Sequence, residues 1–184
     1  SLLRLPAEGG PAALYHVPGL EPWDWRLSTP MPALRRMVGA DLDQELVYAL
    51  TARNEVIALD LQTARPRPVL AQSVREVTIG PDGTLFTVDD SLRVVQFVRR
   101  NPVRFATRLP ARPRDLFGTR GAALIAISAG TANGLTLLHP GEPPKRSELP
   151  TGDAAATFWG DLLAIAADSA VILTDPEHPD PLLA

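Results

Sequence analysis

The sequence predicts an all-β protein, a partial or small β-propeller of about four to five four-stranded blades. The main observation is a pair of short apolar runs, separated by a polar turn, that occurs four times. The second residue of each leading run is Val47, Phe86, Ile125 and Leu163, and subtraction places them 39, 39 and 38 residues apart. A hairpin repeated with a period of about 40 residues is typical of propeller blades.

Two further observations agree with this fold class. The 19 Pro and 13 Gly residues fall between the apolar runs rather than in one tract, which indicates many turns. No segment carries a long apolar stripe at 3.6-residue spacing, so helices are not expected. With 45% hydrophobic but only 5% aromatic residues, the core must consist mainly of Leu, Val, Ile and Ala.

The composition limits the kinds of site that the chain can hold. Cysteine is absent, which excludes disulfides and thiolate metal sites within the chain. No apolar run approaches the roughly 18 residues that a membrane-spanning helix needs. The sequence begins without Met and without a signal peptide, so we expect a mature form or the ordered part of something longer. Membrane association would then need a partner or an anchor outside this sequence.

Residues 1–30 are predicted to form an N-terminal partial blade. Its expected strands are Leu2–Leu5, Ala13–Val17 and Trp23–Leu27. Trp23 and Trp25 would lie on one face of the last strand, because side chains alternate with period two. They are either a platform for a partner or packing between neighbouring blades, and packing is the favoured interpretation.

The first full repeat is predicted over residues 33–71. Its expected strands are Leu34–Val38, Leu46–Leu50, Val56–Leu61 and an outer Pro68–Ala71. Prolines suit an outer strand, since proline cannot donate to an interior ladder. Asp60 and Thr63 are expected to cap the turn that leaves the third strand, which is a structural role.

This repeat resembles the YVTN-type branch of the YVTN and quinoprotein-like β-propeller repeat family. The matching residues are Val47, Tyr48, Asn54, Val56, Ala58, Asp60 and Thr63. The turn Gly80-Pro81-Asp82-Gly83 is likewise similar to turns in YVTN and TolB-like propellers. The resemblance implies the propeller fold over about residues 33–184, and it supplies no catalytic residue.

The second repeat is predicted over residues 73–110. Its expected strands are Val77–Ile79, Leu85–Val88, Val94–Phe97 and an outer, half-exposed Val103–Leu109. Gly80–Gly83 has the composition of a hairpin turn, with Pro at the first turn position and Gly able to take a positive φ. Asp89-Asp90-Ser91 forms the next turn, and two adjacent acids fall short of the six to eight oxygens that calcium takes.

The last two repeats are predicted over residues 111–150 and 151–184. The expected strands of the third are Asp115–Phe117, Ala122–Ser128, Leu135–His139 and Lys145–Leu149. Those of the fourth are Ala154–Phe158, Leu162–Ala166, Ala170–Thr174 and Leu182–Leu183. All four repeats and the partial blade are expected to form a single domain.

The net charge of −3 hides a gradient along the chain. Residues 65–120 hold 11 basic and 5 acidic residues, a balance of +6, while residues 121–184 hold 2 and 8, a balance of −6. The candidate interaction residues in the basic segment are Arg99, Arg100, Arg104 and Arg108. Because few aromatic residues lie among the arginines of this segment, we expect no nucleic acid, and a protein or an anionic lipid surface is the expected partner.

No catalytic, cofactor-binding or metal-binding residue is predicted. His16, His139 and His178 lie in different repeats without zinc-binding spacing, and no Gly-x-Ser-x-Gly elbow exists. We therefore expect a non-catalytic propeller without a cofactor, acting as an interaction or scaffold subunit in the periplasm or cell envelope, with the cytoplasm left open. The alternative is a quinoprotein-like or lactonase-like propeller enzyme or small-ligand binder.

Overall fold

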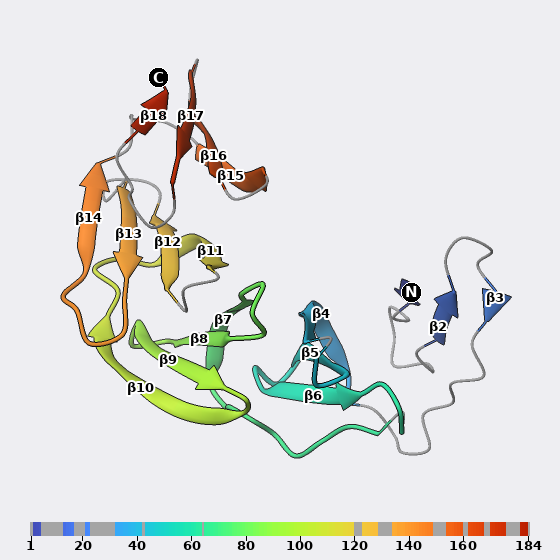
Figure 1. Ribbon diagram of the computed structural model, residues 1–184. Helices are drawn as coiled ribbons and strands as arrows, with labels where there is room; N and C mark the ends of the chain where they lie inside the picture. The colour runs from blue at the N-terminus through green and yellow to red at the C-terminus, as the bar shows by residue number, and fades with distance from the viewer. Residues whose placement is uncertain are drawn as a thin grey trace. The chain divides into compact units, whose positions relative to one another are not determined.

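The computed structural model describes residues 2–4, 13–16, 21–22, 32–41, 43–63, 65–119, 123–128, 134–148, 154–159, 162–167, 170–175 and 181–183. The chain divides into two compact units, Ser1–Val74 and Arg75–Ala184, and each is described by itself. The prediction of a single domain stays a prediction. Every regular element in the described residues is a β-strand (Figure 1), which confirms the predicted all-β class.

The first unit contains two antiparallel sheets of three strands. The N-terminal sheet joins β1 (Leu2–Arg4), β2 (Ala13–His16) and β3 (Glu21–Pro22) in that order. The next sheet joins β4 (Leu34–Asp41), β5 (Leu46–Thr51) and β6 (Val56–Asp60). The strand expected at Trp23–Leu27, and with it Trp23 and Trp25, lies outside the described residues.

The predicted outer strand Pro68–Ala71 is corrected to two isolated bridges. Pro66 pairs with Leu59 and Ala71 pairs with Val56, on either side of a stretch without strand geometry. Backbone hydrogen bonds nevertheless hold this segment along β6, for example from Arg67 N to Ala58 O at 2.7 Å. The physical reason is that Pro66 and Pro68 have no N–H to donate, so a continuous ladder cannot form.

The second unit contains three antiparallel sheets of four strands, each in sequence order. Their strands are β7 (Val74–Ile79, whose first residue belongs to the first unit), β8 (Leu85–Asp89), β9 (Arg93–Val98) and β10 (Asn101–Arg108); β11 (Pro113–Gly118), β12 (Leu124–Ser128), β13 (Gly134–Leu138) and β14 (Lys145–Glu148); and β15 (Ala154–Trp159), β16 (Leu162–Ala167), β17 (Ala170–Thr174) and β18 (Pro181–Leu183). Every strand predicted for the last three repeats has a counterpart here, displaced by a few residues at its ends.

Apolar clusters between successive sheets hold the second unit together. One face of β12 gives Leu124 and Ala126 to a cluster that also contains Phe86 and Val94 of the preceding sheet. The opposite face gives Ile125 and Ile127 to a cluster with Leu163 and Ile165 of the following sheet, as the alternation of side chains along a strand requires. All five residues of β12 are buried, because sheets cover both of its faces. Four-stranded sheets stacked in this way are propeller blades.

Candidate functional site at the Asp89 turn

The order of strands decides which loops of a blade share one end. In an antiparallel sheet of consecutive strands, the second strand ends where the first begins. The turn between β8 and β9, the start of β7 and the end of β10 therefore lie at the same end of their sheet. We call this the loop end of the sheet; Arg75, the turn Asp89–Leu92 and Arg108 lie there. The turns at Gly80–Gly83 and Arg99–Arg100 lie at the opposite end.

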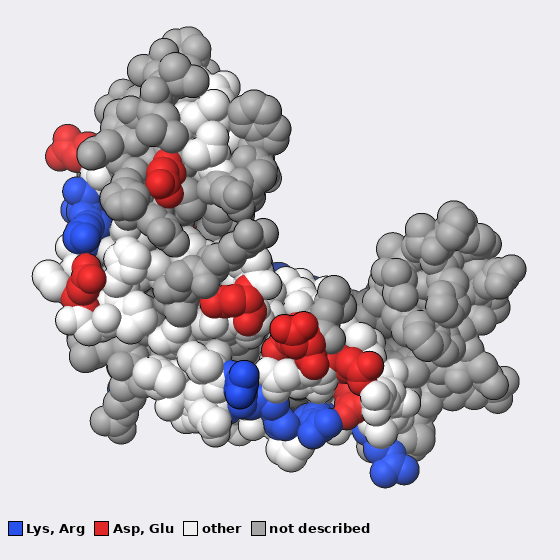
Figure 2. All heavy atoms as spheres, in the orientation of Figure 1, with Lys and Arg blue, Asp and Glu red and all other residues white. Residues whose placement is uncertain are grey.

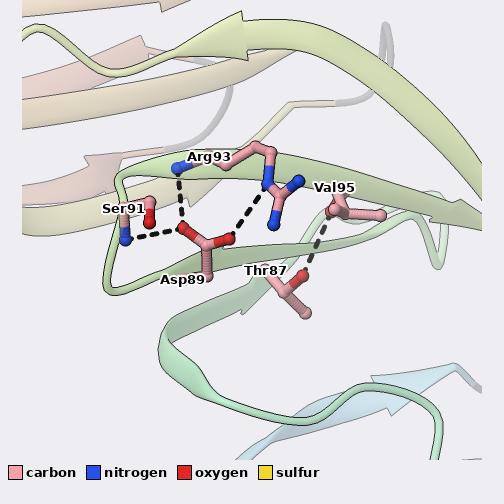
Figure 3. A network of polar contacts seen from close by, with 5 residues as sticks. All are labelled: Thr87, Asp89, Ser91, Arg93 and Val95. Atoms are coloured by element: carbon pink, nitrogen blue, oxygen red, sulfur yellow. Dashed lines mark hydrogen bonds and ion pairs between the residues drawn. The ribbon is translucent and has the colours of Figure 1, made fainter.

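Asp89 organises the turn at the loop end through three hydrogen bonds (Figure 3). Its Oδ1 accepts from the backbone N–H of Ser91 at 2.8 Å and of Arg93 at 3.0 Å. Its Oδ2 accepts from the Arg93 guanidinium Nε at 3.1 Å, which also makes an ion pair. Next to this network, the Thr87 hydroxyl points at the carbonyl oxygen of Val95, at a long 3.5 Å. The carboxylate therefore fixes both the loop backbone and one arginine.

These contacts shift the ionisation of Asp89. Partial burial alone would raise the pKa of this carboxyl, because the charged form loses solvent. The hydrogen bonds from the backbone N–H and guanidinium of Arg93 and from the backbone N–H of Ser91 act in the opposite direction. They outweigh burial, and the pKa of Asp89 is lowered below its usual range. Asp89 is thus a permanent anion at neutral pH, which is the opposite of a poised general acid.

A depression of about 350 Å³ opens beside this turn. Its lining consists of Arg75, Asp89, Asp90, Leu92 and Arg112. Arg75 and Asp90 form only a loose pair, with Nε and Oδ1 4.0 Å apart and the Asp90 side chain 77% exposed. Leu92 is half-buried at φ 62°, and its carbonyl accepts from Leu109 N at 2.9 Å, so the chain path around the depression is fixed.

The structure places the predicted arginines at two different ends of the β9–β10 hairpin. Arg99 and Arg100 form the two-residue turn between these strands, while Arg108 ends β10, roughly 20 Å along the strand at about 3.3 Å per residue. Arg108 is instead the register partner of Arg93. Arg104 is described only by its backbone in β10. The arginines named from the sequence therefore do not share one turn.

The Arg99–Arg100 turn has an unusual backbone. Both residues have positive φ, 47° and 68°, and the flanking Val98 and Asn101 are register partners. Two positive φ angles define the type I′ hairpin turn, which Asn-Gly fits far better than two long side chains do. The Nε atom of Arg100 is buried without a hydrogen-bond partner. This turn carries strain that its sequence does not explain.

Residues that sequence reasoning missed are Arg75, Leu92, Arg93 and Arg112. They were overlooked because the basic residues were judged by their density in the sequence, not by the strand ends from which they project. Assigning each expected turn to one end of its sheet would have grouped Arg75 and Arg112 with Asp89, because Asp89 follows the expected strand Leu85–Val88 and the two arginines come two and three residues before the expected strands Val77–Ile79 and Asp115–Phe117.

Other turn carboxylates play the structural role predicted for them. Asp60 Oδ1 accepts from Gln62 N at 3.0 Å and from Thr63 N at 2.9 Å, and Arg67 binds Oδ2, which confirms the predicted cap. The hydrogen bond from the Thr63 backbone, then that from Arg67, lowers the pKa of Asp60 to about 2. Asp41 accepts from Gln44 N at 3.1 Å in the same manner. The carboxylates of Asp41 and Asp60 therefore stabilise the turns in which they lie.

The described residues add two observations about metals and membranes. Among them, His, Asp and Glu side chains nowhere gather in groups of three or more that could hold a metal ion. Within the same part of the chain, no helix has the length and apolarity to cross a membrane. On the face drawn in Figure 2, basic side chains lie among acidic ones rather than in one uniform patch.

Comparison with known proteins identifies the fold. No protein-family model matches the sequence, and no curated protein matches it by sequence. BamB from Moraxella catarrhalis is similar in structure, with a TM-score of 0.66 and 16% identity over 98% of this chain and 60% of that chain. The β-propeller domain of Cps50 (Swd1) from Myceliophteria thermophila has a TM-score of 0.61 and 13% identity, over 84% of this chain and 56% of that chain.

The WD40 domain of SCAP from fission yeast is also similar, with a TM-score of 0.59 and 13% identity over 94% of this chain and 46% of that chain. Identities this low show the fold alone, and they confirm the β-propeller class. The chain spans less than two thirds of each of these three structures.

Proposed function

We propose that this chain is a non-catalytic β-propeller that acts as a protein-interaction or scaffold subunit of a larger assembly. One observation carries the proposal. The carboxylates of Asp89 at the loop end and of Asp41 and Asp60 in turns of the first unit, which an enzyme would need for acid or base chemistry, are occupied by turn hydrogen bonds. Asp60 and Asp89 both have lowered pKa values and hold no proton to give at neutral pH.

The architecture supports the same function. Stacked sheets with apolar clusters on both faces form a rigid body, on which turns such as Asp89–Leu92 are held in fixed positions. A rigid surface loses little conformational entropy on binding, which favours stable association with a partner. Arg99, Arg100, Arg104 and Arg108, together with Trp23 and Trp25, remain the contact residues proposed from the sequence.

The finer parts of the proposal concern family and compartment. The resemblance of Leu46–Thr63 to YVTN-type repeats supports membership of that propeller family and, with it, a place in the periplasm or cell envelope. Association with a membrane would then run through a partner. Fractionation of native cells, with detection of the chain by antibody, tests the location, and recovery with the cytoplasmic fraction would contradict it.

One observation favours the alternative, a small-ligand binder or propeller enzyme. The depression at the Asp89 turn has about the volume of a small-molecule pocket, and two carboxylates line it. Its open shape and the engagement of Asp89 by Arg93 favour the scaffold instead.

Purification at native abundance separates the two functions. The chain would be tagged at its chromosomal locus, cross-linked in intact cells, and isolated with its partners. We expect one or a few proteins in stable stoichiometry and a native mass well above the mass of the same tagged chain measured under denaturing conditions. Recovery of the chain alone, without cross-linked partners, would contradict the scaffold proposal.

A further inference from the structure

Two guanidinium groups near the depression have no charge partner. Arg108 and Arg112 are both exposed, and within the described part of the chain neither makes a hydrogen bond or an ion pair. Most other basic side chains of this region are engaged: Arg93 by Asp89, Arg114 by Asp115, and Arg75 loosely by Asp90. Arg108 and Arg112 are therefore the cations available to a partner.

The pairing of β9 with β10 adds to the positive charge at the loop end, because it places Arg93 opposite Arg108. Arg93 and Arg108 are register partners, so their Cβ atoms lie about 5 Å apart on one face of the sheet. Like charges at that spacing repel, and Asp89 neutralises only Arg93. Counting Arg75, Arg93, Arg108 and Arg112 against Asp89 and Asp90 gives four minus two, a balance of +2. A carboxylate of a partner molecule would reduce this excess of positive charge.

The depression also offers an apolar contact. Leu92 lies among the charged lining residues and packs from beneath against the cluster of Phe86, Val88 and Leu109. The core therefore holds the exposed part of the Leu92 side chain in a fixed position at the surface. Basic groups around a fixed apolar side chain suit a peptide in which acidic and apolar residues alternate.

We infer that this depression and the adjoining end of β10 bind an acidic segment of a partner protein, with carboxylates against Arg112 in the depression and Arg108 at the end of β10, and an apolar side chain on Leu92. The inference rests on the proposed function and names its partner class. A protein segment fits better than nucleic acid because none of the lining residues is aromatic, so bases have no stacking surface.

Direct binding to defined probes tests the inference with the full chain. The probes are a fluorescein-labelled hexapeptide that alternates Glu and Leu, its counterpart that alternates Gln and Leu, and labelled single-stranded oligothymidine. Fluorescence anisotropy should show binding of the Glu peptide that weakens with salt, and at least about tenfold weaker binding of the other two probes.

Variants then locate the binding site. Arg112→Glu should weaken binding of the Glu peptide at least about tenfold, and Arg112→Lys should weaken it only a few-fold, because charge is kept while the planar fork is lost. Lys145→Glu, the same charge change on an exposed residue of β14, is the matched control and should bind as the unchanged chain does. Circular dichroism and thermal melting confirm that each variant is folded.

Three results would overturn the inference: equal affinity for the Glu and Gln peptides, unchanged binding by Arg112→Glu, or tighter binding of oligothymidine. The native complex distinguishes this failure from failure of the proposed function. If the native partner is recovered equally well with Arg112→Glu, this surface is wrong and the scaffold function stands. If the Glu peptide needs Arg112 but cells yield no partner, the surface stands and the scaffold function falls.

Discussion

Gly80 and Gly118 approach each other so closely that neither position has room for a side chain. A Cβ built on Gly118 would lie 2.6 Å from the backbone nitrogen of Gly80 and 2.7 Å from its Cα. Gly118 ends β11 and Gly80 follows β7, so this contact joins the first strands of two successive blades. Both atoms in the way are backbone, and neither can rotate aside.

Gly118→Ala should therefore destabilise the second unit by about 2–3 kcal/mol or more, since overpacking against a fixed backbone forces strands apart. Gly134→Ala is the matched strand control. Its Cβ would meet the Arg146 side chain and the Ser147 carbonyl oxygen at 3.1 Å, so we expect a smaller loss. Urea denaturation followed by tryptophan fluorescence measures both. Equal stabilities of the two variants would contradict the close approach.

The Asp60 cap gives the first unit a pH-dependent stability. The folded pKa of about 2 lies below the ordinary value of 3.8, so the charged form stabilises the fold. This contribution is fully present above pH 3.8 and is lost as the pH falls from there to about 2. Asp60→Asn should cost about 1–2 kcal/mol at pH 7, because hydrogen bonds from Thr63 and Arg67 then reach a neutral acceptor.

Denaturant unfolding at pH 7, 4 and 2 measures this dependence. The difference between the original chain and Asp60→Asn should shrink toward pH 2, where the carboxyl is protonated. Asp43→Asn is the control, since Asp43 is exposed and the structure gives it no hydrogen bond among the described residues. A difference that stays constant from pH 7 to pH 2 would show that ionisation of Asp60 does not matter.

Asp89 also shields Arg93 from Arg108. Removing the carboxylate by Asp89→Ala should cost about 1–2 kcal/mol, from the lost turn hydrogen bonds and the uncovered repulsion. In an Arg108→Ala background the same change should cost about 0.5 kcal/mol less. A double-mutant cycle at low salt gives this coupling energy. Additive effects of the two substitutions would mean that the facing arginines do not sense each other.

Substitution of the Arg99–Arg100 turn between β9 and β10 should increase the stability of the fold. Replacing Arg99 and Arg100 by Asn and Gly supplies residues that accept the positive φ angles of 47° and 68°. We expect a gain of about 1–2 kcal/mol and a higher Tm, because strain and the unpartnered Arg100 Nε both disappear. If the gain appears but the native partner is lost, the turn is retained for binding. A loss of stability would mean that the arginine side chains compensate for their backbone.

The inner strands could be read from the sequence because their burial leaves a pattern. Strands such as β5 and β12 are buried on both faces, and each appears in the sequence as an unbroken apolar run. Their hairpins at a constant period then identify the blades. The turn role of Asp60 followed from the same local chemistry, in which a carboxylate accepts from N–H groups two and three residues later.

The outer strand of the first repeat and the site were harder to predict for a different reason. Proline leaves an outer segment free to be a strand or a loop, and only the bridges at Pro66 and Ala71 show which occurs. The grouping of Arg75, Asp89 and Arg112 depends on which strand ends are adjacent in space. The pairing of Arg93 with Arg108 depends on a register shift between Arg104 and Arg108, which apolar periodicity does not reveal.

The strictly sequential strand order has a consequence for how the chain acquires its structure. In the sheets of the second unit, each strand pairs only with the strand before and after it in sequence, so no ladder needs a segment from a distant part of the chain. Such low contact order lets hairpins close quickly. During synthesis, the β7–β10 blade could complete its ladder while β11 is still being made, and each finished blade would then offer an apolar face as a template for the next.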